Sequence, residues 1–487
     1  MRSHQAIRMV LALAAVVAVL MACGRAVPGK PRAEGEVDPG TVAGLQVTDD
    51  DQVRSGPRDG APAPGLDAEN ADNGEMDQLA LAALADLYEY WNERMPADFE
   101  GQKFTPLNRL VSYDSKGKAL RLCQTSTSGL INAFYCSLDD SIAWDRGVLL
   151  PELAKQFGKM SVVTVLAHET GHAVQFKLGP KSGITQGTKT IVKEQQADCY
   201  AGAFFRWIAD GKSKRFQIST GEGLNKVLAT MFFIRDPAGT DANKQGAHGL
   251  AWDRVFGFQV GFSDGPQRCA KMDQDEIDKR ISEQKFSEKD AQNRGNIPVN
   301  ADNMAKLKVS LDEAFKQSGI TPPQLKDNGS KCAQGKATQP AAYCEADNTV
   351  VFDMKKLAAL GKPPKRDQEV GEDGVGIGDF AAFAEVASRY TLSVQKAVGL
   401  RLDDEKAALR TACLTGAWAR VAEQPGTDQN PLRISPGDLD EAVAEMLMGD
   451  SLIAANINGE PVKAGFARVE AFRVGYTNAK ECTARFA

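Results

Sequence analysis

Two histidines four residues apart constrain this chain more than any other feature. His168 and His172 stand in an apolar run, and Glu169 directly follows the first of them. On a helix, positions four apart lie on one face, so both imidazoles can reach one metal ion, with the Glu169 carboxylate beside the open side of that ion. The whole chain has only four histidines. The pattern therefore predicts a zinc ion bound by His168 and His172.

A third metal ligand is expected downstream, because zinc peptidases usually keep three protein ligands and leave one position for water. Glu194 is the best candidate, and Asp198 follows it four residues later on the same predicted helical face. We expect Glu194 to bind the metal. We expect Asp198 to accept a hydrogen bond from a ligating histidine and so to orient its ring.

These residues indicate the hydrolysis of an amide bond. Zinc lowers the pKa of its water to about 7, and Glu169 would act as the general base and then protonate the leaving nitrogen. A second donor usually stabilises the oxyanion. His248 is the first candidate for this catalytic role and Tyr200 the second, while the alternative for His248 is a purely structural histidine.

The N-terminus predicts export. Arg2 and Arg8 precede an apolar run from residue 9 to 21, which is too short for a comfortable membrane span but suits a signal peptide. The run ends in Leu20-Met21-Ala22-Cys23, which resembles the lipobox of bacterial lipoproteins. We expect a signal peptide over 1–23, a diacylated Cys23, and a mature chain anchored by lipid on the outer face of the cytoplasmic membrane. A plain secretory signal is the alternative.

Composition sets further limits. Residues 24–76 are rich in Gly, Pro, Ala and Asp, which predicts a disordered tether. The formal net charge of −6 argues against a nucleic-acid partner. Apart from Cys23 the chain has eight cysteines, an even number that suggests disulfides in an oxidising compartment.

The remainder of the chain is predicted to be duplicated. Short segments of the first half recur in the same order in the second, so that each half has four cysteines in equivalent places. The simplest pairing is within halves. It gives Cys123–Cys136, Cys199–Cys269, Cys332–Cys344 and Cys413–Cys482.

The second half lacks the metal pattern. When the halves are aligned on their shared residues, none of the ligands has a counterpart, and no histidine follows His248. The positions opposite His168, Glu169, His172, Glu194 and Asp198 hold Ser388, Arg389, Leu392, Ala408 and Ala412. We expect a metallopeptidase domain over 77–275 and a degenerate, metal-free repeat over 290–487.

The spaced motifs around the site resemble those of the bacterial neutral zinc metallopeptidases. The resemblance covers about residues 80–275, and the residues that carry it are Phe134, Tyr135, Cys136, Trp144, Asp145, His168, Glu169, His172, Gln175, Ala197, Asp198, Cys199, His248, Gly249 and Arg254. It implies a zincin-like, mostly helical α+β fold with a small sheet whose edge strand lies beside the substrate. It also implies His168, His172 and Glu194 as ligands and Glu169 as the base. Where the family often has a second histidine after the distal ligand, this chain has Ala173.

The sequence thus predicts a membrane-anchored zinc metallopeptidase, an endopeptidase acting on protein or peptide substrates. The alternative is a non-catalytic surface lipoprotein whose zinc stabilises a binding scaffold. Hydrolysis of a non-protein amide, such as one in cell-wall peptides, is a third possibility.

Overall fold

The computed structural model describes residues 38–244, 246–280, 282, 284–363, 376–423 and 432–486. The predicted signal peptide, Cys23 and the start of the predicted tether lie outside these ranges. In the described part of the chain, no helix has the length and apolar character needed to cross a bilayer.

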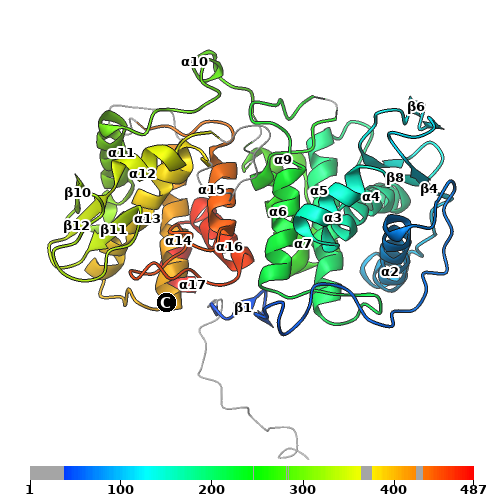
Figure 1. The fold of residues 1–487 in the computed structure, drawn as a ribbon, viewed down its shortest axis with the longest axis horizontal. Helices are drawn as coiled ribbons and strands as arrows, with labels where there is room; N and C mark the ends of the chain where they lie inside the picture. Colours follow the sequence, from blue (N-terminus) through cyan, green and yellow to red (C-terminus); the bar gives the residue numbers. More distant parts are fainter. Residues whose placement is uncertain are drawn as a thin grey trace, which may run out of the picture. The chain divides into compact units, whose positions relative to one another are not determined.

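Helices are the most abundant secondary structure of the first half (Figure 1), in agreement with the predicted, mostly helical α+β class. α5 contacts both α4 and α7, and these three helices hold the candidate site. Gly261 on α7 permits the closest approach, because a Cβ there would lie 1.7 Å from the Cys199 carbonyl oxygen on α5. The larger helices are α2 (Glu75–Asp98), α3 (Leu149–Phe157), α4 (Met160–Leu178), α5 (Thr190–Ala209), α6 (Glu222–Phe233) and α7 (Ala251–Asp264).

A three-stranded sheet lies against α4. Its order is β4 (Arg109–Tyr113), β8 (Ser141–Asp145), β7 (Ala133–Cys136), with β4 parallel and β7 antiparallel to the central strand. An isolated bridge from Glu69 to Val111 covers the β4 edge, whereas β7 ends the sheet on the other side and contacts α4. The edge strand expected beside the site is therefore β7.

Residues 38–76 are part of the folded body, so the prediction of a free tether over 24–76 is wrong for this stretch. β1 (Thr41–Val42) pairs with β2 (Leu45–Gln46), and β3 (Gly56–Pro57) pairs with β9 (Phe216–Gln217). Arg58 donates to the carbonyl oxygens of Ser213 and Phe216 at 3.1 and 2.8 Å. Polar contacts to a distant loop, rather than an apolar core of its own, hold this segment in place.

The second half has the same strand pattern. β10 (Gln324–Asp327), β12 (Thr349–Phe352) and β11 (Ala341–Cys344) form a sheet in that order, with one parallel and one antiparallel pairing. A Cβ at Gly475 would lie 1.7 Å from the Cys413 carbonyl oxygen, as at Gly261. The main helices are α13 (Asp379–Ala397), α14 (Glu405–Ala422), α15 (Asp438–Leu447) and α16 (Gly465–Thr477).

The remaining elements of the described chain are short, except for the 14-residue helix α11 (Ala301–Ala314). They are β5 (Arg121–Leu122), β6 (Thr125–Ser126), η1 (Gly179–Ser182), α8 (Pro266–Cys269), α9 (Gln274–Asp278), α10 (Glu288–Ala291), α11 (Ala301–Ala314), η2 (Lys316–Ser318), α12 (Met354–Leu360) and α17 (Glu481–Arg485). All four predicted disulfides are present: Cys123–Cys136, Cys199–Cys269, Cys332–Cys344 and Cys413–Cys482.

The two halves share one hydrophobic core, which includes residues of both. α6 and α7 of the first half contact α15 and α16 of the second. The Trp252 main-chain N–H donates to Asp440 at 2.9 Å, and the Gln259 side chain donates to the Phe466 carbonyl oxygen at 2.9 Å. The predicted boundary between residues 275 and 290 therefore separates two chain segments but not two cores.

Candidate metal centre

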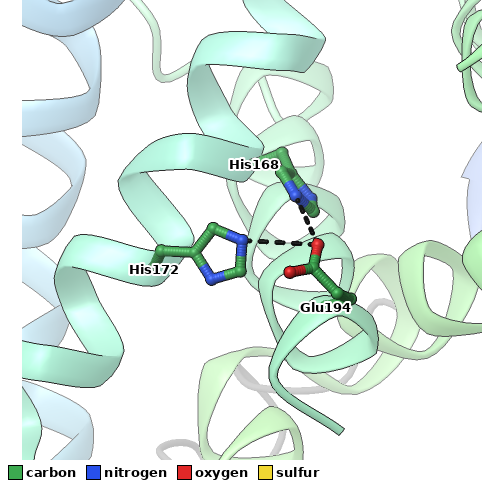
Figure 2. A group of neighbouring side chains, drawn as sticks. All are labelled: His168, His172 and Glu194. Carbon is green, nitrogen blue, oxygen red and sulfur yellow. Dashed lines mark hydrogen bonds and ion pairs between the residues drawn. The ribbon is translucent and has the colours of Figure 1, made fainter. Parts of the chain in front are cut away.

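Three side chains from two helices converge on one point (Figure 2). His168 and His172 stand one turn apart on α4, and Glu194 faces them from α5. One Glu194 oxygen, Oε2, lies 3.2 Å from Nε2 of His168 and 3.4 Å from Nε2 of His172. Gly171 lets the two helices meet here, because a Cβ at that position would lie 2.9 Å from the Ala197 main chain.

The spacing of these three atoms fits a zinc ion. Zinc binds histidine nitrogens and carboxylate oxygens at about 2.0–2.2 Å in a tetrahedron, which places neighbouring ligand atoms about 3.3–3.5 Å apart. The two measured separations, 3.2 and 3.4 Å, agree with this value. Two imidazole nitrogens and one carboxylate oxygen also leave a fourth position, as in zinc hydrolases. His168, His172 and Glu194 would hold the metal.

Asp198 and Arg254 lie on the Nδ1 side of the His168 ring, away from Glu194. Asp198 Oδ1 lies 2.7 Å from Nδ1 of His168, so the other ring nitrogen faces Glu194. Arg254 on α7 donates to both Asp198 oxygens, at 2.9 and 3.1 Å, and all three side chains are buried. The role expected for Asp198, to orient a ligating ring, matches this geometry.

Electrostatics favour ionised carboxylates at this centre. Burial opposes the charged form, but Arg254 and His168 outweigh it and lower the pKa of Asp198. Burial likewise opposes ionisation of Glu194, yet the two histidines hold its pKa well below the ordinary value. Burial lowers the pKa of His168, whereas the Asp198 and Glu194 carboxylates raise it, to about 10. The site therefore favours a positive charge, and in the metal-free chain a proton on His168 supplies it.

Gln175 orients the second histidine, a role that the sequence did not reveal. Its Oε1 lies 3.1 Å from Nδ1 of His172, and its Nε2 donates to the Lys193 carbonyl oxygen at 2.7 Å. The side chain therefore ties the ligand on α4 to the main chain next to Glu194 on α5. The spacing of three residues from His172 was the only available signal, and such pairs are common on helices.

Glu169 lies between the metal ligands and the edge strand. Its Oε2 accepts a hydrogen bond from the Tyr135 main-chain N–H of β7 at 2.9 Å, and the residue is buried. This contact fixes the carboxylate at the β7 edge of the sheet, and the role of Glu169 as a general base stays a prediction.

His248 does not join the three ligands. It lies on the loop before α7, its side chain is half exposed, and its Nδ1 is 3.4 Å from Oδ1 of Asp236. Tyr200 is also apart: its buried ring packs edge-on against Trp91, with 5.3 Å between centroids. The Tyr200 hydroxyl has no hydrogen-bond partner among the described residues, and no contact supports it as an oxyanion donor.

In the second half, the residue aligned with Glu169 is a buried arginine, Arg389. Arg389 is fully buried on α13 and donates to the carbonyl oxygens of Leu452, Ala455 and Asn456 at 2.7–2.8 Å. Gln395 keeps a contact to the Ala407 carbonyl oxygen, at 3.4 Å, but its Oε1 accepts from Arg410 instead of facing a histidine. Two buried arginines thus supply the polar contacts around these residues of the second half.

Comparison with known proteins agrees with this site. A family model described as "Putative neutral zinc metallopeptidase" matches residues 37–272, just under half of the chain. The family predicted from the motifs is therefore confirmed, and it implies zinc. Uncharacterized proteins of Mycobacterium bovis and of two Mycobacterium tuberculosis strains are each 28% identical over 162 residues. The matched stretch is 29% of this chain and 55% of each relative, so the chain spans about half their length. No solved structure matches.

Proposed function

We propose that the chain is a zinc-dependent peptidase that hydrolyses internal peptide bonds of an extended substrate. The observation that carries the proposal is the convergence of His168, His172 and Glu194 at tetrahedral spacing, with Glu169 fixed next to them. Zinc, when bound, supplies an acidified water and a polarised substrate carbonyl. The remaining chemistry belongs to the side chains of the protein.

Glu169 would transfer the protons. Its carboxylate accepts a proton from the attacking water and passes it to the leaving nitrogen as the amide bond breaks. The hydrogen bond from Tyr135 holds the carboxylate in position through both transfers. Asp198, with Arg254 behind it, keeps the His168 ring turned toward the metal while charge develops in the transition state.

The free edge of β7 would align the substrate. Main-chain groups alternate between the two sides of a strand, and the Tyr135 N–H points away from β8, so the Ala133 main chain faces the same open edge. A peptide that added to this edge as a further strand would pass directly over Glu169. The opposite edge is covered at Glu69, which leaves β7 as the strand that can accept a peptide.

His248 remains our candidate for the second donor to the oxyanion. The loop that carries His248 leads directly into α7, the helix that carries Arg254. Gly249, the next residue, donates its main-chain N–H to Asp236 and so anchors this loop. A His248→Ala variant should keep its zinc and lose turnover by about 100-fold, the usual effect of one lost oxyanion donor. Unchanged turnover would remove His248 from the mechanism.

The cellular place of the enzyme rests on the sequence. We propose that Cys23 is acylated after cleavage of the signal peptide and that the folded part acts outside the cytoplasmic membrane. Disulfides in both halves agree with an oxidising compartment. Metabolic labelling with palmitate tests this location, because a Cys23→Ala chain should lose both the label and its association with membranes.

We also propose that the second half is a degenerate copy of the first. The shared strand pattern, the equivalent glycines Gly261 and Gly475, and the contacts of Gln175 and Gln395 to matching carbonyl oxygens support the duplication. A common origin would favour one alternative function for the chain, a non-catalytic scaffold stabilised by zinc. The second half would then be a copy that kept its fold after losing the metal ligands and catalysis.

Glu169→Gln separates the enzyme from the scaffold. The variant should keep zinc and fold but lose cleavage of a peptide library, whereas Glu152→Gln on the exposed face of α3 should cleave as the native chain does. Equal cleavage by native chain and Glu169→Gln would end the enzymatic proposal. Purified cell-wall fragments, assayed in parallel, test the non-protein amide.

A further inference from the structure

A second cluster of acidic side chains lies in the second half, on helices that carry none of the zinc ligands. Asp379 is the first residue of α13, and Asp438 and Glu441 stand in the first turn of α15. One carboxylate oxygen from each lies within 4.8 Å of the others. Asp379 is 3% exposed and Asp438 5%, so water screens this negative charge poorly.

Helix capping explains only part of the cluster. Glu441 Oε2 accepts from the Phe380 main-chain N–H at 2.8 Å, and Asp438 Oδ2 accepts from the Ser435 N–H at 2.7 Å. Each of these residues thus uses one oxygen on the main chain. The Asp379 carboxyl also accepts from a main-chain N–H, that of Ile297, but its Oδ1 is fully buried and has no hydrogen-bond partner among the described residues. Buried carboxylate oxygens are rarely left without a donor or a cation.

Among the residues that the structure describes, no lysine, arginine or histidine forms an ion pair with these three carboxylates. Arg433 is the positive side chain that acts on Asp438, but its guanidinium bonds both oxygens of Asp290, at 2.6 and 2.7 Å. Burial and mutual repulsion accordingly raise the pKa values of Asp438 and Glu441 well above their ordinary range. The arrangement lacks a positive charge at its centre.

We infer that Asp379, Asp438 and Glu441 form a second cation site, distinct from the zinc centre, that binds a calcium ion. All donors are hard oxygen atoms, with no nitrogen or sulfur, and this set favours calcium over zinc. Calcium–oxygen bonds of about 2.3–2.6 Å allow ligand oxygens to lie up to about 5 Å apart, in agreement with the cluster. Glu441 is partly exposed, so water could reach the ion on this side and complete the coordination shell.

The ion would join the starts of two helices. Gly378, directly before α13, leaves room for Glu441, because a Cβ at that glycine would lie 1.9 Å from the carboxylate. Calcium bound here fixes α13 against α15, and α15 contacts α6 and α7 of the first half. The second half would thus have exchanged a catalytic metal for a structural one.

Calorimetric titration of the full chain tests the inference. The protein is stripped with chelator, reloaded with one equivalent of zinc and titrated with calcium chloride. One calcium ion should bind, and the thermal midpoint should rise by about 2–4 °C, as for a stabilisation that is modest for a chain of this size. Absence of binding at millimolar calcium would overturn the inference.

Two variants assign the site. Asp438→Asn should bind calcium at least about tenfold more weakly, since affinity follows the number of ligand charges. Without calcium the same variant should melt no lower than the native chain, because it removes repulsion. Asp302→Asn, an exposed first-turn acid of α11, is the matched control and should bind as the native chain does. Native binding by Asp438→Asn, or binding lost only in His168→Ala, would refute this location.

Discussion

The Asp198→Asn variant distinguishes two roles of this buried carboxylate, which pairs with Arg254 and orients the His168 ring. Asp198 accepts from His168 and from two nitrogens of Arg254, and it is fully buried. The asparagine has nearly the same shape but no charge. It leaves the Arg254 guanidinium without a counterion, which should lower the free energy of unfolding by about 3–5 kcal/mol.

Zinc affinity should fall in the same variant for a separate reason. The amide holds the His168 ring less firmly in the orientation that turns Nε2 toward Glu194. Loss of such a supporting carboxylate typically lowers metal affinity about 10–100-fold, equivalent to about 1.4–2.7 kcal/mol. Competition with a chromophoric chelator measures the affinity, and denaturant unfolding of the metal-free chain measures stability.

Asp86→Asn provides the control. Asp86 is also fully buried, and it forms an ion pair with Arg215 at 2.7 Å, remote from the metal ligands. Because Arg215 keeps a second partner, Glu89 at 2.8 Å, this variant should lose less stability than Asp198→Asn and keep native zinc affinity. If both variants bind zinc equally well, Asp198 has no role in orienting His168, and the account of the supporting residues is refuted.

Three further predictions use the rest of the chain. Gln175→Leu should weaken zinc binding about tenfold, whereas Gln395→Leu should leave zinc binding unchanged. Each variant should lose about 1–3 kcal/mol of stability in denaturant unfolding. Equal zinc affinity in both variants would contradict the role of Gln175 in positioning His172. Replacing Cys199 and Cys269 by alanine opens a link across 70 residues and should lower the free energy of unfolding by about 4 kcal/mol, and an unchanged denaturation midpoint would count against it. Burial and an acidic neighbour raise the pKa of Glu385 well above its ordinary value, so its contribution to stability is present at low pH and lost as pH rises. Glu385→Gln should therefore reduce the stability lost as pH rises above the ordinary glutamate range, and an unaltered pH profile of unfolding would exclude this.

Periodicity made the convergence of His168, His172 and Glu194 predictable. The pairs His168 with His172 and Glu194 with Asp198 are each four residues apart on a helix, so a helical interpretation places both members of each pair on one face. The disulfides followed from the repeated cysteine pattern, for which the simplest pairing lies within each half. These features depend on local geometry or on repetition, which a single sequence records.

Tertiary contacts made the rest unpredictable. The partner of Gln175 is a main-chain carbonyl at Lys193, and that of Glu169 is a main-chain N–H at Tyr135, so no residue type marks either contact. Residues 38–76 lack the apolar residues of a core, and composition therefore indicated disorder. The chain instead holds this segment by strand pairing and by Arg58, through contacts to a loop about 150 residues away.

Anomalous X-ray scattering at the zinc absorption edge tests the central claim most directly. Crystals grown from protein purified without chelator should show one strong zinc peak, within about 2.2 Å of Nε2 of His168, Nε2 of His172 and a Glu194 oxygen. A zinc peak elsewhere, or crystals of zinc-loaded protein without a peak between these three atoms, would contradict the account.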